Sequence, residues 1–210
     1  MIKVFIVDDH EIIREGLKKI LKEESDLIVV AEAQNGVEAL EKIPNTECDI
    51  MLLDMNMPGR SGIDLLSDLK ALKPQLNILV LSIHPEDKFA LRTLKAGASG
   101  YLCKDTALDE LVVAIRKIHA KGRYLSATLA EQLAFDVMPD KESLPHEQLS
   151  SRELEIMLML ASGKKVKTIA AELTLSVSTV FTYRVRIFEK LNIKNDVELT
   201  HYAMNNKLIS

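Results

Sequence analysis

Ile2-Lys3-Val4-Phe5-Ile6-Val7 is a short apolar run at the start of the chain, and two carboxylates, Asp8 and Asp9, follow it directly. Similar runs recur at 27–33, 49–53, 77–82 and 99–103. They are β-branched or leucine-rich and do not alternate apolar with polar residues, which is typical of strands buried on both faces of a parallel sheet. Helix-period segments separate them. Residues 1–125 are therefore predicted to form an α/β domain with a five-stranded, doubly wound parallel sheet.

The rest of the chain changes character twice. Residues 126–148 contain a helical pattern at 127–135 and then a polar, proline-containing stretch, so this segment is predicted to be a linker with one short helix. Residues 149–210 are predicted to be all-helical. Ser150 and Glu153 have the spacing of a capping box, a short helix is expected over 166–173, Ser176 begins a helix over 177–191, and Asn195 caps a final one.

Composition and charge limit the function classes. With 47% hydrophobic and 28% charged residues, the chain is globular rather than disordered. The net charge of −4 divides into −3 for residues 1–125, −3 for 126–145 and +2 for 146–210, so only the last segment is suited to a basic face. There is no signal peptide, no apolar run near the roughly 20 residues of a membrane span, and no metal-ligand spacing of the two cysteines. A soluble, cytoplasmic protein without a membrane partner is expected.

Polar residues stand at the carboxyl ends of the predicted strands, where such a sheet places its ligands. Asp8 and Asp9 follow the first strand, Asp54 the third, Ser82 ends the fourth, and Lys104 follows the fifth. A single strand-end aspartate is usually a helix cap, but here five suitable groups converge on one edge. Clustered carboxylates repel one another unless a cation lies among them, and Mg²⁺ suits such oxygen ligands. A carboxylate can also be the nucleophile toward a phosphoryl group.

These residues resemble the receiver domain of response regulators, on the motifs Val7-Asp8-Asp9-His10, Leu53-Asp54-Met55-Asn56-Met57-Pro58-Gly59 and Gly100-Tyr101-Leu102-Cys103-Lys104. The resemblance implies a flavodoxin-like fold in which Asp54 accepts phosphate from a sensor histidine kinase. It implies a Mg²⁺ site made by Asp8, Asp9, Asp54 and the backbone carbonyl of Asn56. Ser82 and Lys104 would contact the phosphoryl oxygens, and Tyr101 would change position with Ser82. His10 is expected to begin a helix beside the pocket rather than to bind the metal.

The segment after residue 148 resembles the LuxR-type helix-turn-helix of NarL/FixJ regulators, and 182–193 is most similar to the GacA/UvrY subgroup. By this resemblance the helix over 177–191 enters the major groove of promoter DNA and the last helix pairs two copies. Val180, Ile187 and Leu191 are spaced as its buried face. The residues expected to contact DNA are Lys165, Lys167, Ser178, Thr179, Thr182, Arg184, Val185 and Arg186. Phe181 is a departure, because many relatives carry lysine there.

Taken together, the patterns predict a DNA-binding response regulator that is switched on by phosphorylation of Asp54 and then forms a homodimer. A phosphohydrolase is disfavoured, because such enzymes usually carry an acid/base aspartate at the position of Asn56. The chain is therefore expected not to be an enzyme, apart from slow self-dephosphorylation. An output that binds protein instead of DNA is disfavoured by the helix-turn-helix pattern. A further hypothesis is that the unphosphorylated receiver covers part of 177–191.

Overall fold

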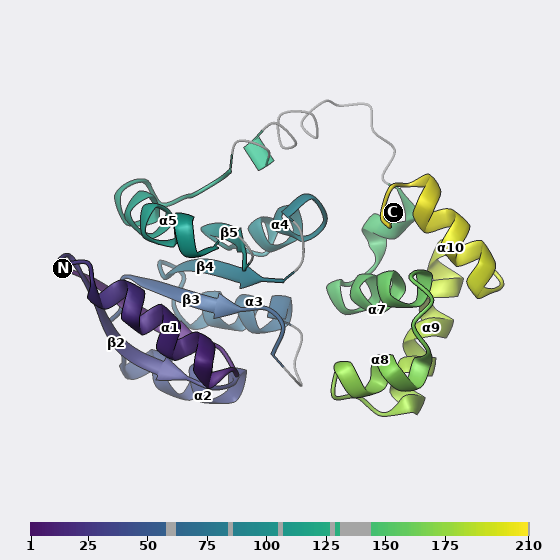
Figure 1. The fold of residues 1–210 in the computed structure, drawn as a ribbon, viewed down its shortest axis with the longest axis horizontal. Coiled ribbons are helices and arrows are strands. Elements are labelled where there is room, and N and C mark those ends of the chain that lie inside the picture. Colours follow the sequence, from purple (N-terminus) through teal and green to yellow (C-terminus); the bar gives the residue numbers. More distant parts are fainter. Residues whose placement is uncertain (58–61, 84–85, 105–106, 127–128, 131–143, 210) are drawn as a thin grey trace. The chain divides into compact units, whose positions relative to one another are not determined.

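The computed structural model describes residues 1–57, 62–83, 86–104, 107–126, 129–130 and 144–209, which divide into two compact units at residues 137 and 138. The first unit alternates strands and helices (Figure 1). Its elements are β1 (Ile2–Val7), α1 (Glu11–Lys22), β2 (Leu27–Ala33), α2 (Gly36–Lys42), the 3₁₀ turn η1 (Ile43–Asn45), β3 (Ile50–Asp54), α3 (Gly62–Leu72), β4 (Asn77–Ser82), α4 (Glu86–Lys95), β5 (Gly100–Cys103) and α5 (Ala107–Lys121).

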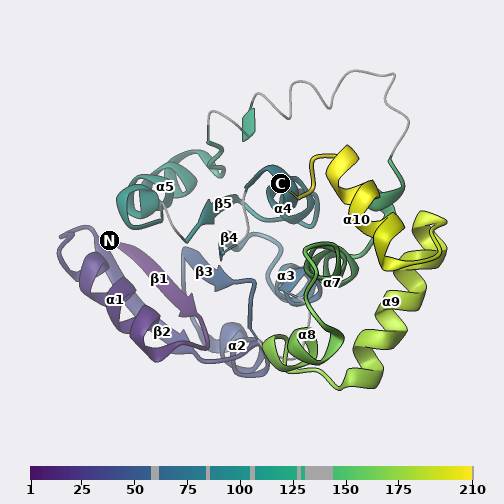
Figure 2. The same cartoon turned by 45° about the vertical axis from the view of Figure 1, so that its right-hand side comes forward.

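The five strands form one parallel sheet in the order β2-β1-β3-β4-β5. This order reverses direction between β1 and β3, which is the switch point of a doubly wound sheet and the place where its ligands bind. Figure 2 shows α1 and α5 on one side of the strands and α3 and α4 on the other. The predicted five-stranded α/β fold is confirmed.

Both faces of the sheet are buried, which explains the continuous apolar runs in the sequence. On one face, α1 and α5 pack with alternate strand residues in a single core, built from Ile2, Val4, Ile6, Leu17, Leu21, Leu27, Ile50, Leu52, Leu79, Leu81, Leu102, Leu111, Ala114, Ile115, Ile118 and Tyr124. The intervening residues Phe5, Met51, Leu53 and Val80 are fully buried on the other face. With both faces covered, the polar strand ends are left as the sheet's binding edge.

The second unit is all-helical, as predicted. It contains the 3₁₀ turn η2 (Pro145–Gln148) and the helices α7 (Ser151–Ala161), α8 (Val166–Glu172), α9 (Val177–Leu191) and α10 (Asp196–Asn205). The capping box of Ser150 with Glu153 is present, and the Ser176 and Asn195 side chains accept hydrogen bonds from the third residue of their helices. None of the helices in the described ranges is long and apolar enough to cross a membrane.

The structure describes the two ends of the expected linker over 126–148, at 126, 129–130 and 144–148. Its last residues belong to the helical unit, because the backbone N–H of His146 donates to the Tyr202 hydroxyl at 3.2 Å and the His146 ring lies 2.9 Å from the same oxygen. At its start, Ser126 accepts a hydrogen bond from the Leu129 N–H, and 129–130 are helical. The rest of the short helix expected over 127–135 lies outside the described residues.

Candidate functional site

The carboxyl ends of four strands bring the predicted acidic site together. Asp8 directly follows β1, Asp54 ends β3, Ser82 ends β4, and Lys104 follows β5. The side chains of Asp8, Asp54 and Ser82 are buried to 1% exposure. Buried charges are costly unless they are paired, so this arrangement is maintained by ion pairs and hydrogen bonds within the site.

Lys104 is the cation that joins the two deepest carboxylates. Its Nζ lies 2.8 Å from Asp8 Oδ2 and 2.9 Å from Asp54 Oδ2. Burial raises the pKa of the Asp54 carboxyl above its usual value, and the Lys104 charge opposes this rise without cancelling it. Burial would lower the pKa of Lys104, but the charge of Asp54 and the hydrogen bonds to both aspartates outweigh it and raise the pKa. The ammonium group is therefore held charged at the site.

The acidic residues offer oxygens for a divalent cation. Ligand atoms of Asp8, Asp9, His10 and Asp54 all lie within 4.8 Å of one another. Asp9 Oδ1 and Asp54 Oδ2 are buried carboxylate oxygens, the first 2.9 Å from the His10 ring and the second 2.9 Å from the Lys104 ammonium. Carboxylate oxygens with unused lone pairs are the ligands that Mg²⁺ prefers, so these residues fit the expected ion. The predicted fourth ligand, the Asn56 backbone carbonyl, stays a prediction.

His10 is a neighbour of this cluster rather than part of its interior. It is the N-cap residue of α1, as expected for a helix-start residue, and its backbone N–H donates to Asp8 Oδ1 at 2.8 Å. Its ring is 61% exposed, with Nδ1 2.9 Å from Asp9 Oδ1. An exposed imidazole is also a poor ligand for Mg²⁺ compared with the carboxylates beside it.

The Asn56 side chain has a role that the sequence did not reveal. Its Oδ1 accepts hydrogen bonds from Ser82 Oγ at 3.1 Å and from the Ile83 N–H at 3.3 Å, while its own backbone N–H donates to Asp54 Oδ1 at 2.9 Å. Asn56 therefore joins the end of β4 to the end of β3. Tyr101, the expected partner of Ser82 in switching, is fully buried on β5.

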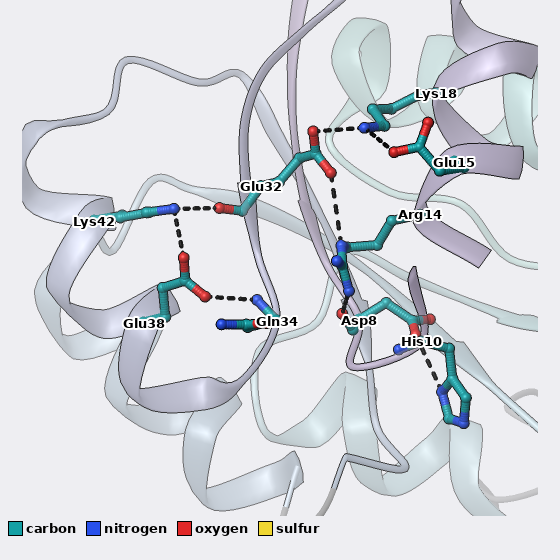
Figure 3. A network of polar contacts seen from close by, with 9 residues as sticks. All are labelled: Asp8, His10, Arg14, Glu15, Lys18, Glu32, Gln34, Glu38 and Lys42. Atoms are coloured by element: carbon teal, nitrogen blue, oxygen red, sulfur yellow. Dashed lines mark hydrogen bonds and ion pairs between the residues drawn. The ribbon is translucent and has the colours of Figure 1, made fainter. Parts of the chain in front are cut away.

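A network of charged side chains, also missed from the sequence, reaches the backbone of Asp8 (Figure 3). The Arg14 guanidinium on α1 donates to the Asp8 backbone carbonyl at 2.8 Å and lies 3.6 Å from Glu32 on β2. Lys18 pairs with the same Glu32 at 2.9 Å. Lys42 donates to the Glu32 backbone carbonyl at 2.7 Å, pairs with Glu38 at 2.6 Å and so extends the network to α2. The loop that follows β1 is thereby tied to α1, β2 and α2.

In the helical unit, α9 has one buried and one exposed face. Val180, Ile187 and Leu191 are buried, which confirms the predicted core side. Ser178, Thr182, Val185 and Arg186 are exposed, as is Phe181. A shallow hollow of about 290 Å³ is lined by Ser178, Thr179, Thr182, Tyr183 and Arg186. Most of the residues expected to contact DNA are thus brought to one side of one helix, and Lys165 and Lys167 are exposed at the start of α8.

Arg184 is placed differently from the other candidates. Its guanidinium donates two hydrogen bonds to the Asp196 carboxylate, both at 2.9 Å, and stacks 4.3 Å from the centre of the Phe188 ring. Its side chain is only 25% exposed. In this structure the guanidinium joins α9 to α10 and is not directed to a ligand. Arg186 makes no hydrogen bond or ion pair within the described part of the chain, so it is the better candidate for a DNA contact.

Comparisons with known proteins agree with both units. Residues 4–116 match the family of response regulator receiver domains, and residues 147–203 match the luxR family of bacterial regulatory proteins. The chain is 41% identical over 209 residues to response regulator UvrY of Escherichia coli K12, covering 99% of this chain and 96% of that protein. It is 40% identical over 210 residues to response regulator GacA of Pseudomonas aeruginosa, covering 100% and 98%.

Solved structures give the same result for the fold. The RcsB response regulator of Salmonella typhimurium superposes with a TM-score of 0.67 at 25% identity, covering 97% of each chain. A structure of RcsB in complex with DNA superposes with a TM-score of 0.59 at 26% identity, covering 97% of this chain and 98% of that one.

Proposed function

The chain belongs to the response regulators that combine a receiver domain with a LuxR-type DNA-binding domain, and on this basis we propose that phosphorylation of Asp54 by a sensor histidine kinase controls the binding of promoter DNA by α9. The observation that carries the proposal is the placement of Asp54. Its carboxylate is 1% exposed at the sheet edge, and its Oδ2 lies 2.9 Å from the Lys104 ammonium.

The chemistry follows from these neighbours. Asp54 Oδ2, beside the Lys104 ammonium, has a lone pair available to attack phosphorus, while the Asn56 N–H fixes the other oxygen. A new O–P bond forms as the P–N bond of the phosphohistidine breaks. Lys104 and Ser82 would donate to the phosphoryl oxygens, which would neutralise charge as in phosphoryl transfer generally. Mg²⁺, held by Asp8, Asp9, Asp54 and the Asn56 carbonyl, would supply further positive charge there.

We infer that the product is a signal and not an intermediate in enzymatic turnover. Asn56 stands where a phosphohydrolase would need a titratable acid/base, and its amide is engaged with Ser82 and Ile83. A carboxamide does not titrate at ordinary pH, so this residue supplies no general acid or base for hydrolysis of the aspartyl phosphate. Slow self-dephosphorylation is consistent with this arrangement.

For the DNA-binding half, we propose that the exposed face of α9 enters the major groove. Ser178, Thr179, Thr182, Val185 and Arg186 would meet base edges or phosphates, and Lys165 and Lys167 would meet the backbone. The net charge of +2 for residues 146–210 supports an anionic partner. The DNA complex of the similar regulator RcsB supports the same partner. Two copies that associate after phosphorylation would bind paired half-sites of the promoter. This binding would take place in the cytoplasm.

A gel-shift titration with and without acetyl phosphate tests this proposal. The parent protein should be labelled in the presence of Mg²⁺ and bind DNA more tightly once labelled. Asp54→Asn should accept no phosphate, because an amide is a far poorer nucleophile. Asp64→Asn, on the exposed side of α3, is the matched control and should behave like the parent. Stoichiometric labelling of Asp54→Asn would show that another residue is the acceptor.

A further inference from the structure

Two large apolar side chains are exposed on the groove side of α9. Phe181 is 49% exposed and Val185 is 53% exposed. They are four residues apart, so they lie one turn apart on the same side of the helix. The hydrophobic core of the unit does not use them, because α9 already buries Val180, Ile187 and Leu191 on its opposite side. Their exposure therefore needs a reason outside the folding of this unit.

The neighbours of these two side chains are polar and cationic. Ser178 and Thr182 lie beside them on the exposed side, and Arg186 follows Val185. The Thr182 hydroxyl donates its only proton to the Ser178 carbonyl at 3.0 Å, so that proton is not available to a base acceptor. On this surface the apolar groups of Phe181 and Val185 therefore stand among hydroxyls and one guanidinium and do not form a continuous apolar patch.

The cations of α9 are few. Arg184 is paired with Asp196, and Lys190 lies 2.6 Å from Glu153. Among the described side chains of this helix, Arg186 is thus the cation left to donate to a guanine edge or a phosphate. Hydrogen-bonding readout of bases by α9 is accordingly limited, and two half-exposed apolar side chains stand beside it.

We propose that Phe181 and Val185 form a thymine-reading pair that contacts the 5-methyl groups of thymines in the major groove. The inference rests on the proposed function, since it requires that α9 enter that groove. The thymine methyl is the apolar group on the major-groove edge, where the other three bases present nitrogen and oxygen donors or acceptors. Placing the Phe181 ring against those polar atoms would leave them without hydrogen bonds, which is costly. Thymine is therefore selected at the positions that the pair faces.

The test uses the full-length phosphorylated protein and DNA in which single methyl groups are removed. A binding site is first selected from a random duplex library, and each thymine is then replaced by deoxyuridine, which differs only by the methyl. Burying one methyl is worth about 0.8 kcal/mol, so each contacted thymine should lose about fourfold in affinity on replacement. Replacement at thymines that the pair does not face should have no effect.

Variants of the pair connect that loss to these residues. In Phe181→Ala, which removes the ring, and in Val185→Ser, which removes both methyl groups, the sensitivity to deoxyuridine should disappear at the thymine that each contacts. Both sites are half-exposed, so thermal melting should match the parent. Val37→Ala, which truncates a side chain that is 69% exposed on α2, is the matched control and should keep the full sensitivity.

The outcomes are distinguishable. If the parent binds every deoxyuridine duplex as tightly as the thymine duplex, the thymine-reading pair is refuted while sequence-specific DNA binding stands. If no duplex is selected at all, the proposed function fails and the inference fails with it. If the variants change sedimentation of the protein but not its sensitivity to the methyl, the two side chains form an interface between copies and the inference is overturned.

Discussion

Arg186→Ala should change the salt dependence of DNA binding and Arg184→Ala should change the stability of the domain, although both remove a cation from α9. Arg186 has no partner within the described part of the chain, whereas Arg184 is held by Asp196 and Phe188. The logarithm of the DNA association constant falls with the logarithm of salt concentration by about 0.9 for each phosphate neutralised. Losing Arg186 from both copies of a dimer should therefore flatten this slope by about 1.8. Between 50 and 200 mM KCl, the loss of affinity should therefore be about 12-fold smaller for the variant than for the parent.

Arg184→Ala should instead lower stability. The ion pair to Asp196 is partly screened, because the aspartate side chain is 55% exposed, so its loss together with the stacking on Phe188 should cost about 1 kcal/mol. In a domain of this size such a loss lowers the melting temperature by about 4–8 °C. Asp196→Asn should lose a similar amount, and the double variant should be less than additive.

Fluorescence anisotropy with a labelled duplex, repeated over the salt series, measures the slope, and calorimetry measures the melting temperature. The decisive comparison is between the two arginine variants at matched phosphorylation. Should Arg184→Ala flatten the slope as much as Arg186→Ala while melting like the parent, the guanidinium must leave Asp196 for DNA. The assignment of Arg184 to the contact between α9 and α10 would then be wrong.

Three further outcomes are expected. Arg14→Gln should weaken Mg²⁺ binding about tenfold in a calorimetric titration, because it removes the donor that holds the Asp8 carbonyl; an unchanged titration would exclude this role. Burial would raise the pKa of Glu153, but hydrogen bonds from Lys190 and Ser150 outweigh it and hold the pKa below its usual value. The contribution of the Glu153 charge to folding stability is therefore present above the ordinary glutamate pKa and is lost as the pH falls through the lowered folded value. Glu153→Gln should therefore cost about 1 kcal/mol in urea melts at pH 7, and the cost should fade in acid unless the charge is irrelevant. A fragment lacking residues 1–145 should bind DNA without a phosphodonor if the receiver covers α9, and binding no better than the unphosphorylated full chain would refute that hypothesis.

The sheet and the acidic edge were predictable because they depend on burial and on chain order. Strands covered on both faces must be apolar throughout, so β1, β2 and β4 were placed with their observed bounds. β3 was predicted one residue early, because Asp49 satisfies the Lys3 N–H with its carboxylate just before the strand. The carboxyl ends of parallel strands share one edge, so Asp8, Asp54, Ser82 and Lys104 were correctly brought together.

Contacts that depend on side-chain conformation and on helix placement were not predictable. Arg184 and Asp196 are 12 residues apart and belong to different helices, and no local spacing rule pairs them. The same holds for Arg14 with Glu32, which pair α1 with β2. Asn56 was recognised by its missing acid/base function, but its amide contact with Ser82 requires knowing how two loops approach each other. The contact between His146 and Tyr202 likewise joins two residues that are 56 positions apart, so no local spacing rule predicts that His146 packs with the helical unit.

The hydrogen bond from Ser82 to Asn56 sets a threshold for the resting protein. Ser82 must give up that bond before its hydroxyl can serve a phosphoryl oxygen, and one such bond contributes about 1 kcal/mol net. In population terms, this favours the resting arrangement about fivefold, and a ligand must make up at least that difference to reverse it. Replacing Asn56 by a residue without an acceptor would raise the basal fraction of active molecules by the same factor. The background output of the unstimulated circuit should thus be adjustable through the side chain of Asn56, whose backbone, and not its amide, faces the phosphoryl chemistry.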